Sequence, residues 1–234
     1  MTEATTSTAM EHERGPFAGL LVAQLFFIGV TPFVSDTGAG NVFLHVAVFG
    51  ILITSAYLSS SSRNLLVISI VILLLTAITW LGPSLLPVTA EEALRVGIAG
   101  LGFTFTASFI LMTIARHERV TTDTILGGIN AYLLMACAFT MFHAAVMVIE
   151  PDAYRLGNDA LREVFTGSHD SRGFSTLLYF SFTTLTTLGY GDIVPVGPVA
   201  RLLTSAEAVL GQLYVAIFIA RLVSLEVNQR SIPR

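Results

Sequence analysis

Long apolar stretches alternate with short polar segments along most of the chain. Each stretch is close to the ~20 residues that an α-helix needs to cross the hydrocarbon core of a bilayer. Serine, glycine and proline gather between the stretches, as they do in turns that connect helices. The pattern therefore predicts six transmembrane helices, at residues 16–35, 41–58, 64–82, 93–115, 126–149 and 199–224.

The composition agrees with a membrane protein and narrows the functional classes. Hydrophobic residues make up 53% of the chain and charged residues 12%, and the mean hydropathy is +0.75. That is too little charge to cover a soluble domain. The basic residues are scattered, which argues against a nucleic-acid partner and leaves membrane lipids as the expected surroundings. The single cysteine, Cys137, excludes an intrachain disulfide, and we expect it to pack in the core.

The placement of arginine predicts the orientation of the chain. The segments 59–63 and 116–124 carry arginine, as does the end of the chain after residue 220, whereas 36–40 and 83–91 contain no Arg or Lys. Cytoplasmic loops are enriched in basic residues, so we expect both termini in the cytoplasm of a cell-membrane protein.

The two ends of the chain are expected to be short cytoplasmic segments. Residues 1–15 are polar and acidic and lack the basic start of a signal peptide. Residues 226–234 form a tail in which we expect no ligand-binding domain.

A shorter polar stretch lies between the last two predicted spans. Residues 172–186 are too short and too rich in hydroxyls to span the bilayer, and they follow a good helix N-cap region at 168–171. We interpret them as a helix that enters the membrane from outside, after a turret at 150–171. The chain then returns outward through 187–192. Non-helical backbone at membrane depth is tolerated only where it lines a cavity or is buried in protein.

The sequence TTLTTLGYGD at residues 183–192 resembles the selectivity filter of tetrameric potassium channels. The resemblance is strong in the filter and extends over 126–224, as outer helix, pore helix, filter and inner helix. It implies an all-α membrane protein with six transmembrane helices, a reentrant pore helix and a filter loop, assembled as a fourfold tetramer. Residues 16–120 would be a four-helix front half and 121–225 the pore domain.

The resemblance also implies how the ion is held. The backbone carbonyls of Thr187, Leu188, Gly189 and Tyr190, with the Thr187 hydroxyl, would replace the water shell of K⁺. Gly189 and Gly191 accept the unusual dihedrals that such a path requires. The side chains of Leu188 and Tyr190 would point away from the ion. One chain supplies a quarter of each ring, so three further identical subunits are the expected partners.

The residues behind the filter depart from the pattern of many relatives. Those relatives carry a carboxylate where this chain has Thr183, so Thr183 cannot share a proton with Asp192. We expect the Tyr179 hydroxyl to bond Asp192 and hold the outer mouth, the alternative being an interfacial aromatic. Thr184 and Thr186 are assigned to filter support with them.

Six spans with a pore after the fifth resemble the layout of voltage-gated channels, but the voltage sensor is missing. A sensor needs several arginines at every third position of span four. Here Arg95 is followed at three-residue steps by uncharged residues. We therefore predict no intrinsic voltage sensing, with Arg95 at the membrane interface near Glu91 and Glu92.

Ionisable side chains inside the spans are functional candidates by default. Glu207 and His143 lie at similar depths and could pair behind the pore helix. The pair would make gating sensitive to protons, or it would serve as a buried hydrogen-bond partner for pore-helix hydroxyls such as those of Thr183 or Thr184. We expect His45 to be a core histidine, because no second ligand type lies at metal spacing.

Three residues of the inner helix are candidates for gating. Gly211 matches the position of the family's inner-helix glycine, and either bending or close helix packing accounts for it. Gln212 would face a water-filled cavity. Phe218, with its apolar neighbours at 216–220, would form a constriction that gates by dewetting.

Together these features predict a passive potassium channel that gates at the filter, at the inner-helix bundle, or at both. We expect no enzyme activity and no organic cofactor, with K⁺ as the transported ion. One alternative is a membrane sensor of lipid, apolar ligand or protons with the pore as reporter. Another is a non-channel potassium-translocating subunit, although those relatives carry four degenerate filter copies in one chain.

Overall fold

The structure is a computed structural model that describes residues 16–34, 40–58, 62–81, 87–116, 119–161 and 170–231. The predictions for the N-terminal segment 1–15, for the N-cap region before residue 170 and for most of the polar segments between the first four spans lie outside these residues.

The predicted spans are helices whose ends differ from the prediction by a few residues. Five helices are long and apolar enough to cross a membrane, and α3 contains a shorter apolar helix, Val42–Tyr57. The largest differences are the earlier start of α5 and the later end of α9. The helices are α2 (Pro16–Val34), α3 (Gly40–Leu58), α4 (Arg63–Leu81), α5 (Val88–Ala115), α6 (Thr122–Ile149), the shorter α8 (Asp170–Leu185) and α9 (Pro198–Ser231).

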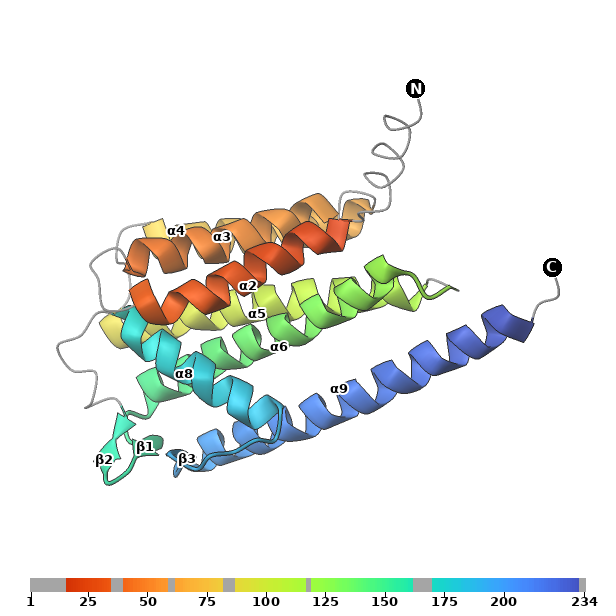
Figure 1. The fold of residues 1–234 in the computed structure, drawn as a ribbon. Helices are drawn as coiled ribbons and strands as arrows, with labels where there is room; N and C mark the ends of the chain where they lie inside the picture. The colour runs from red at the N-terminus through yellow and green to blue at the C-terminus, as the bar shows by residue number, and fades with distance from the viewer. Residues whose placement is uncertain are drawn as a thin grey trace.

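The helices are arranged in layers. Helices α2, α3 and α4 cover one side of an antiparallel α5–α6 hairpin, and α9 runs along the other side (Figure 1). Helix α8 is inclined across α6 and contacts both α6 and α9. The first residue of α2 and the last residues of α9 lie at the same end of the molecule, opposite the strands (Figure 1). The filter segment therefore returns toward the end that carries the strands.

The α5–α6 hairpin is the most extensive helix pair. Only residues 116–121 connect the two helices, and Thr121 caps α6 by accepting the N–H of Thr124 at 3.2 Å. The buried core side chains of the α5–α6 hairpin include Phe103 and Ile110 of α5 and Leu134 of α6. Helix α6 thus packs against the front half of its own chain.

A small antiparallel sheet at one end was missed by the all-α prediction. It contains β1 (Tyr154–Leu156), β2 (Asp159–Ala160) and β3 (Ile193–Pro195), in the order β2-β1-β3. Tyr154 pairs with Pro195, which ties the turret to the segment that directly follows the filter. Strands of two or three residues are too short to produce a recognisable alternation of polar and apolar positions.

Candidate functional site

The filter segment begins where α8 ends, at Leu185. The Thr187 N–H donates to the Thr184 carbonyl at 2.9 Å, and the Gly189 N–H donates to the Thr183 carbonyl at 3.0 Å. These bonds use carbonyls from the last turn of α8, which otherwise have no partner within the helix. They fix the direction in which the chain leaves the pore helix.

The backbone of the filter segment alternates in handedness. Thr187, Gly189 and Gly191 have φ angles of 59°, 52° and 77°, and the residues between them have negative φ. Alternation of positive and negative φ can turn successive peptide planes so that their carbonyls face one side of the chain. Carbonyl oxygens aligned in this way can replace the water shell of a dehydrated cation.

Thr187 is under backbone strain. Among the residues that the structure describes, it is the only non-glycine with a positive φ, and this region is especially unfavourable for a β-branched side chain. Such strain costs ~1–3 kcal/mol and persists where surrounding contacts hold it, often at functional sites. Here the Gln212 side chain of α9 donates from Nε2 to Thr187 Oγ1 at 3.0 Å. Gln212 thus reaches the inner end of the filter.

One side chain of the filter segment packs against α8. Tyr190 stacks on Tyr179 of α8, with ring centroids 6.3 Å apart and planes 8° apart. In the single chain the side chains of Tyr190 and Leu188 are largely exposed.

The contact expected behind the filter is present. Tyr179 Oη donates to Asp192 Oδ2 at 2.8 Å, and Asp192 Oδ1 accepts the N–H of Ile193 at 3.0 Å. Thr183 and Thr186 instead donate to carbonyls of their own helix, at Phe180 and Phe182. Thr184 is buried beside them. Of these candidates, Tyr179 is the one whose side chain bonds Asp192.

Glu207 and His143 are brought together in the interior, as the sequence suggested. His143 Nε2 lies 2.8 Å from Glu207 Oε2, and both side chains are completely buried. The expected partner is a hydroxyl of the pore helix, and the structure shows that Ser181 of α8, rather than the two threonines given as examples, bonds Glu207 Oε1. On the other side of the imidazole, the Tyr154 hydroxyl of β1 lies 2.6 Å from His143 Nδ1. Sequence reasoning missed Ser181 and Tyr154.

Gly211 lies where α9 crosses the end of α8. A Cβ atom there would be 2.1 Å from the main-chain oxygen of Leu185. The same oxygen accepts the Tyr132 hydroxyl of α6 at 3.2 Å. This geometry supports close packing, one of the two explanations considered for Gly211.

Phe218 packs against α6 in the single chain, and its role in a constriction stays a prediction. Its ring stacks on Tyr214 at 5.7 Å and covers Gly128 of α6, where an added Cβ would lie 2.0 Å from the ring. Gln212, which bonds the filter, is exposed on another face of α9. Phe218 therefore packs between helices of the pore domain and does not line the side of α9 that carries Gln212.

The remaining candidates have structural contacts. His45 packs edge-on against Trp80 with ring centroids 4.2 Å apart, and Cys137 is buried. Arg95 pairs with Glu91 at 2.9 Å and donates to the Thr79 carbonyl. No cluster of three or more His, Cys, Asp or Glu that could hold a metal ion occurs within the described ranges.

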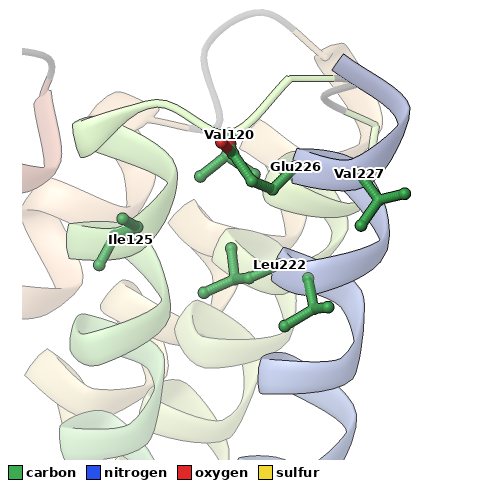
Figure 2. Close-up of a pocket in the computed structure, with 6 residues that line it drawn as sticks. Val120, Ile125, Leu222, Glu226 and Val227 are labelled. Atoms are coloured by element: carbon green, nitrogen blue, oxygen red, sulfur yellow. The ribbon is translucent and has the colours of Figure 1, made fainter. Parts of the chain in front are cut away.

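A shallow pocket of about 410 Å³ lies far along α9 from the filter. Figure 2 shows its walls, which come from the α5–α6 connection, the first turn of α6 and the last turns of α9. They are apolar except for one carboxylate, and are formed by Val120, Ile125, Leu222, Val223, Glu226 and Val227.

Comparison with known proteins places these features in a family. A family model described as "Ion channel" matches residues 135–228, which include the filter segment and most of α6 and α9. Protein LctB of Bacillus caldotenax is 31% identical over 115 residues, which cover 47% of this chain and 76% of that protein. No solved structure matches the chain significantly.

Two potassium channels match a smaller region. The inward rectifier potassium channel Kirbac3.1 of Paramagnetospirillum magnetotacticum is 35% identical over 65 residues, 28% of this chain. The two pore potassium channel a of Oryza sativa subsp. japonica is 32% identical over 73 residues, 31% of this chain. The matches span only 20% and 21% of the lengths of those two proteins.

The comparisons point to a channel rather than an enzyme. They coincide with the part of the chain where the handedness of the backbone alternates between two apolar helices. This chain belongs to the ion channel family.

Proposed function

We propose that the protein is a potassium-selective pore that conducts K⁺ passively as a homotetramer. The observation that carries this proposal is the alternation of positive and negative φ from Thr187 to Gly191. The names of the two potassium channels similar to this region support the choice of ion.

The ligands in this mechanism are main-chain oxygens. Carbonyls of Thr187, Leu188, Gly189 and Tyr190 from four subunits form successive rings, and each ring replaces the water that K⁺ loses on entry. The Thr187 hydroxyl adds the innermost ring. Because Thr187 Oγ1 accepts a hydrogen bond from Gln212, its remaining lone pair is available to the ion. The pore helix α8 directs its C-terminal end, with its partial negative charge, toward the inner end of this path.

The exposure of α9 supports an assembly of several subunits. Only 6% of its membrane-spanning window is buried within the single chain, although this helix bonds the filter through Gln212. Apolar side chains such as Leu202, Val209 and Leu213 are exposed. In a fourfold assembly, neighbouring subunits and lipid would cover these faces.

Helix α5 lacks the row of arginines that a voltage sensor needs. Arg95 is the one arginine of α5, and its side chain is held by Glu91 and the Thr79 carbonyl near the start of that helix. A gating charge must move across the membrane potential, which contributes ~2.3 kcal/mol per charge and 100 mV. We therefore propose that the pore opens without intrinsic voltage sensing. We also propose that the protein lies in the cell membrane with both termini on the cytoplasmic side.

The experiment that tests the function uses purified protein in liposomes. We expect flux of K⁺ to exceed flux of Na⁺ by a large factor and to change little with membrane potential. Mass photometry in detergent should give four subunits. Equal permeability to Na⁺ and K⁺ would overturn the selectivity, and a mass other than four subunits would overturn the tetramer.

The pocket in Figure 2 supports a second candidate function, a membrane sensor of lipid or apolar ligand with the pore as reporter. Its walls join the α5–α6 connection to the end of α9, so a lipid or apolar ligand there would contact the inner helix directly. Under this candidate, liposomes of a single lipid species conduct only after the ligand is added. Conduction by protein alone would favour the simple pore.

A further inference from the structure

A continuous line of polar groups crosses the pore domain behind the filter. It runs from Tyr154 of β1 through His143 of α6 and Glu207 of α9 to Ser181 of α8. Ser181 Oγ also lies 2.8 Å from the main-chain oxygen of Ala136 in α6. The side chains of Tyr154, His143, Ser181 and Glu207 are all 0% exposed. Water cannot supply missing protons in such a site, so each contact must contain a proton from the groups themselves.

The contacts of the Ser181 hydroxyl decide whether Glu207 carries a proton. Its hydroxyl has one hydrogen, and it contacts two oxygens, those of Ala136 and Glu207. The Ala136 oxygen belongs to a peptide carbonyl and can only accept. If Ser181 donates to Ala136, the contact with Glu207 contains a proton only when the carboxyl group itself donates.

We propose that Glu207 is held as a neutral carboxylic acid and acts as a positioning residue for the filter. Its Oε1–H donates to Ser181, whose hydroxyl donates to the Ala136 carbonyl. Its Oε2 accepts from His143 Nε2–H, and His143 Nδ1 accepts the Tyr154 hydroxyl. Each of the four contacts then contains one proton, and all donors point in one direction along the line.

An ion pair of Glu207 and protonated His143 accounts for the geometry less well. Ser181 would then donate to the carboxylate and leave its 2.8 Å contact with Ala136 without a proton. Tyr154 would accept from His143 Nδ1–H, and its own buried hydrogen would need another acceptor. Desolvating two charges costs several kcal/mol per ion, which the neutral arrangement avoids.

Within the part of the chain that the structure describes, His143 is the basic side chain that contacts Glu207. The other ionisable groups that act on the line are the neutral hydroxyl of Tyr132 near Glu207 and the carboxyl of Glu150 near Tyr154. Neither would compensate a negative charge on Glu207.

The position of Glu207 explains how it acts on conduction. It lies one helical turn before Gly211, where α9 contacts the main chain at the end of α8. The bond to Ser181 and this close contact together fix α8 against α9 at two points. Because α8 leads directly into Thr187, the neutral acid sets the position of the filter without touching the ion.

Glu207→Gln is the decisive variant, because glutamine reproduces the proposed proton pattern. Its amide N–H can donate to Ser181 while its oxygen accepts from His143. We expect K⁺ flux and the K⁺/Na⁺ flux ratio within about twofold of the original protein, with the same profile from about pH 5.5 to 8. Ser181→Ala removes the acceptor on α8 and should lower the flux ratio by roughly tenfold, the factor that corresponds to one lost buried hydrogen bond. A changed pH profile in Glu207→Gln, or an unchanged flux ratio in Ser181→Ala, would overturn the proposal.

Infrared spectroscopy tests the protonation without a flux assay. The original protein should show the carbonyl band of a protonated carboxylic acid at pH 8. The band should be absent in Glu207→Gln, and in Ser181→Ala it should move to higher frequency, because the acid loses its acceptor. Absence of the band in the original protein would overturn the assignment even if the variants fail to fold. The flux experiment rests on the proposed pore function, whereas the infrared experiment does not. The two experiments can therefore fail separately.

Discussion

Gly211 offers a test of how the inner helix is held. A Cβ atom at this position would lie 2.1 Å from the Leu185 oxygen, and Cβ atoms in proteins essentially never come closer than 3.0 Å to another atom. Gly211→Ala therefore requires α8 and α9 to separate by ~0.9 Å, the difference between these two distances. Overpacking of this kind costs ~1–3 kcal/mol. The better helix propensity of alanine offsets at most ~1 kcal/mol of this cost.

The net effect should therefore be a loss of up to ~3 kcal/mol in each subunit. The Leu185 oxygen also accepts the Tyr132 hydroxyl, and Leu185 lies two residues before Thr187. A shift at this point consequently reaches the start of the filter. We expect Gly211→Ala to lower both the melting temperature of the purified protein and the K⁺/Na⁺ flux ratio in liposomes.

The matched control is Gly97→Ala in α5. It makes the same chemical change inside a helix, but no atom lies within 4 Å of the new Cβ, so it should leave stability unchanged or slightly raised. If Gly211→Ala behaves like this control in stability and selectivity, and only slows the flux, the packing explanation is refuted. Bending of α9 at Gly211 would then be the better explanation.

Three further predictions concern other contacts of the pore. Tyr179→Phe removes the bond to Asp192 and should accelerate the decay of current in planar bilayers, and an unchanged decay would reject the tether. Gly189→Ala places a side chain at φ 52°, a strain of ~1–2 kcal/mol per subunit, and should abolish K⁺ flux while four subunits remain together, so sustained flux would contradict the filter assignment. Arg221→Gln removes the bonds from Nη2 to the last carbonyls of α5, at Ile114 and Ala115. Hydrogen exchange at the end of α5 should become roughly fivefold faster, as expected for ~1 kcal/mol, and an unchanged rate would show that this cap is dispensable.

The positions of the helices and of the filter could be predicted because their signals are local. An apolar run of sufficient length marks a membrane helix wherever it packs, and the two glycines at 189 and 191 mark a backbone with unusual dihedrals. The pairing of His143 with Glu207 was also predictable, since two ionisable groups at the same depth of a membrane need a partner.

Which hydroxyl of the pore helix bonds Glu207 could not be predicted in the same way. Positions 181 and 183 are separated by about 200° around a helix, so they face nearly opposite sides. Hydroxyl residues occur on every side of α8, and the sequence alone gives no reason to prefer one. The orientation of α8 is set by its packing against α6, where Ser181 reaches the Ala136 carbonyl.

The contact of Phe218 with α6 could not be predicted for a related reason. Residues 216–220 are uniformly apolar, so no polar position among them shows which side chain faces another helix. The useful signal was on another helix, where Gly128 leaves the space that the Phe218 ring fills. Sequence analysis of one helix at a time does not detect such complementary pairs.

The short connection between α5 and α6 has a mechanical consequence. Only residues 116–121 separate the two helices in the sequence, and the helices pack extensively against each other. Arg221 adds a third element by linking the end of α5 to α9. If the chain forms the proposed pore, a lateral force on the front half would reach α6 and α9 through these contacts. Stretching or thinning the membrane would then act on the pore helices of the same subunit.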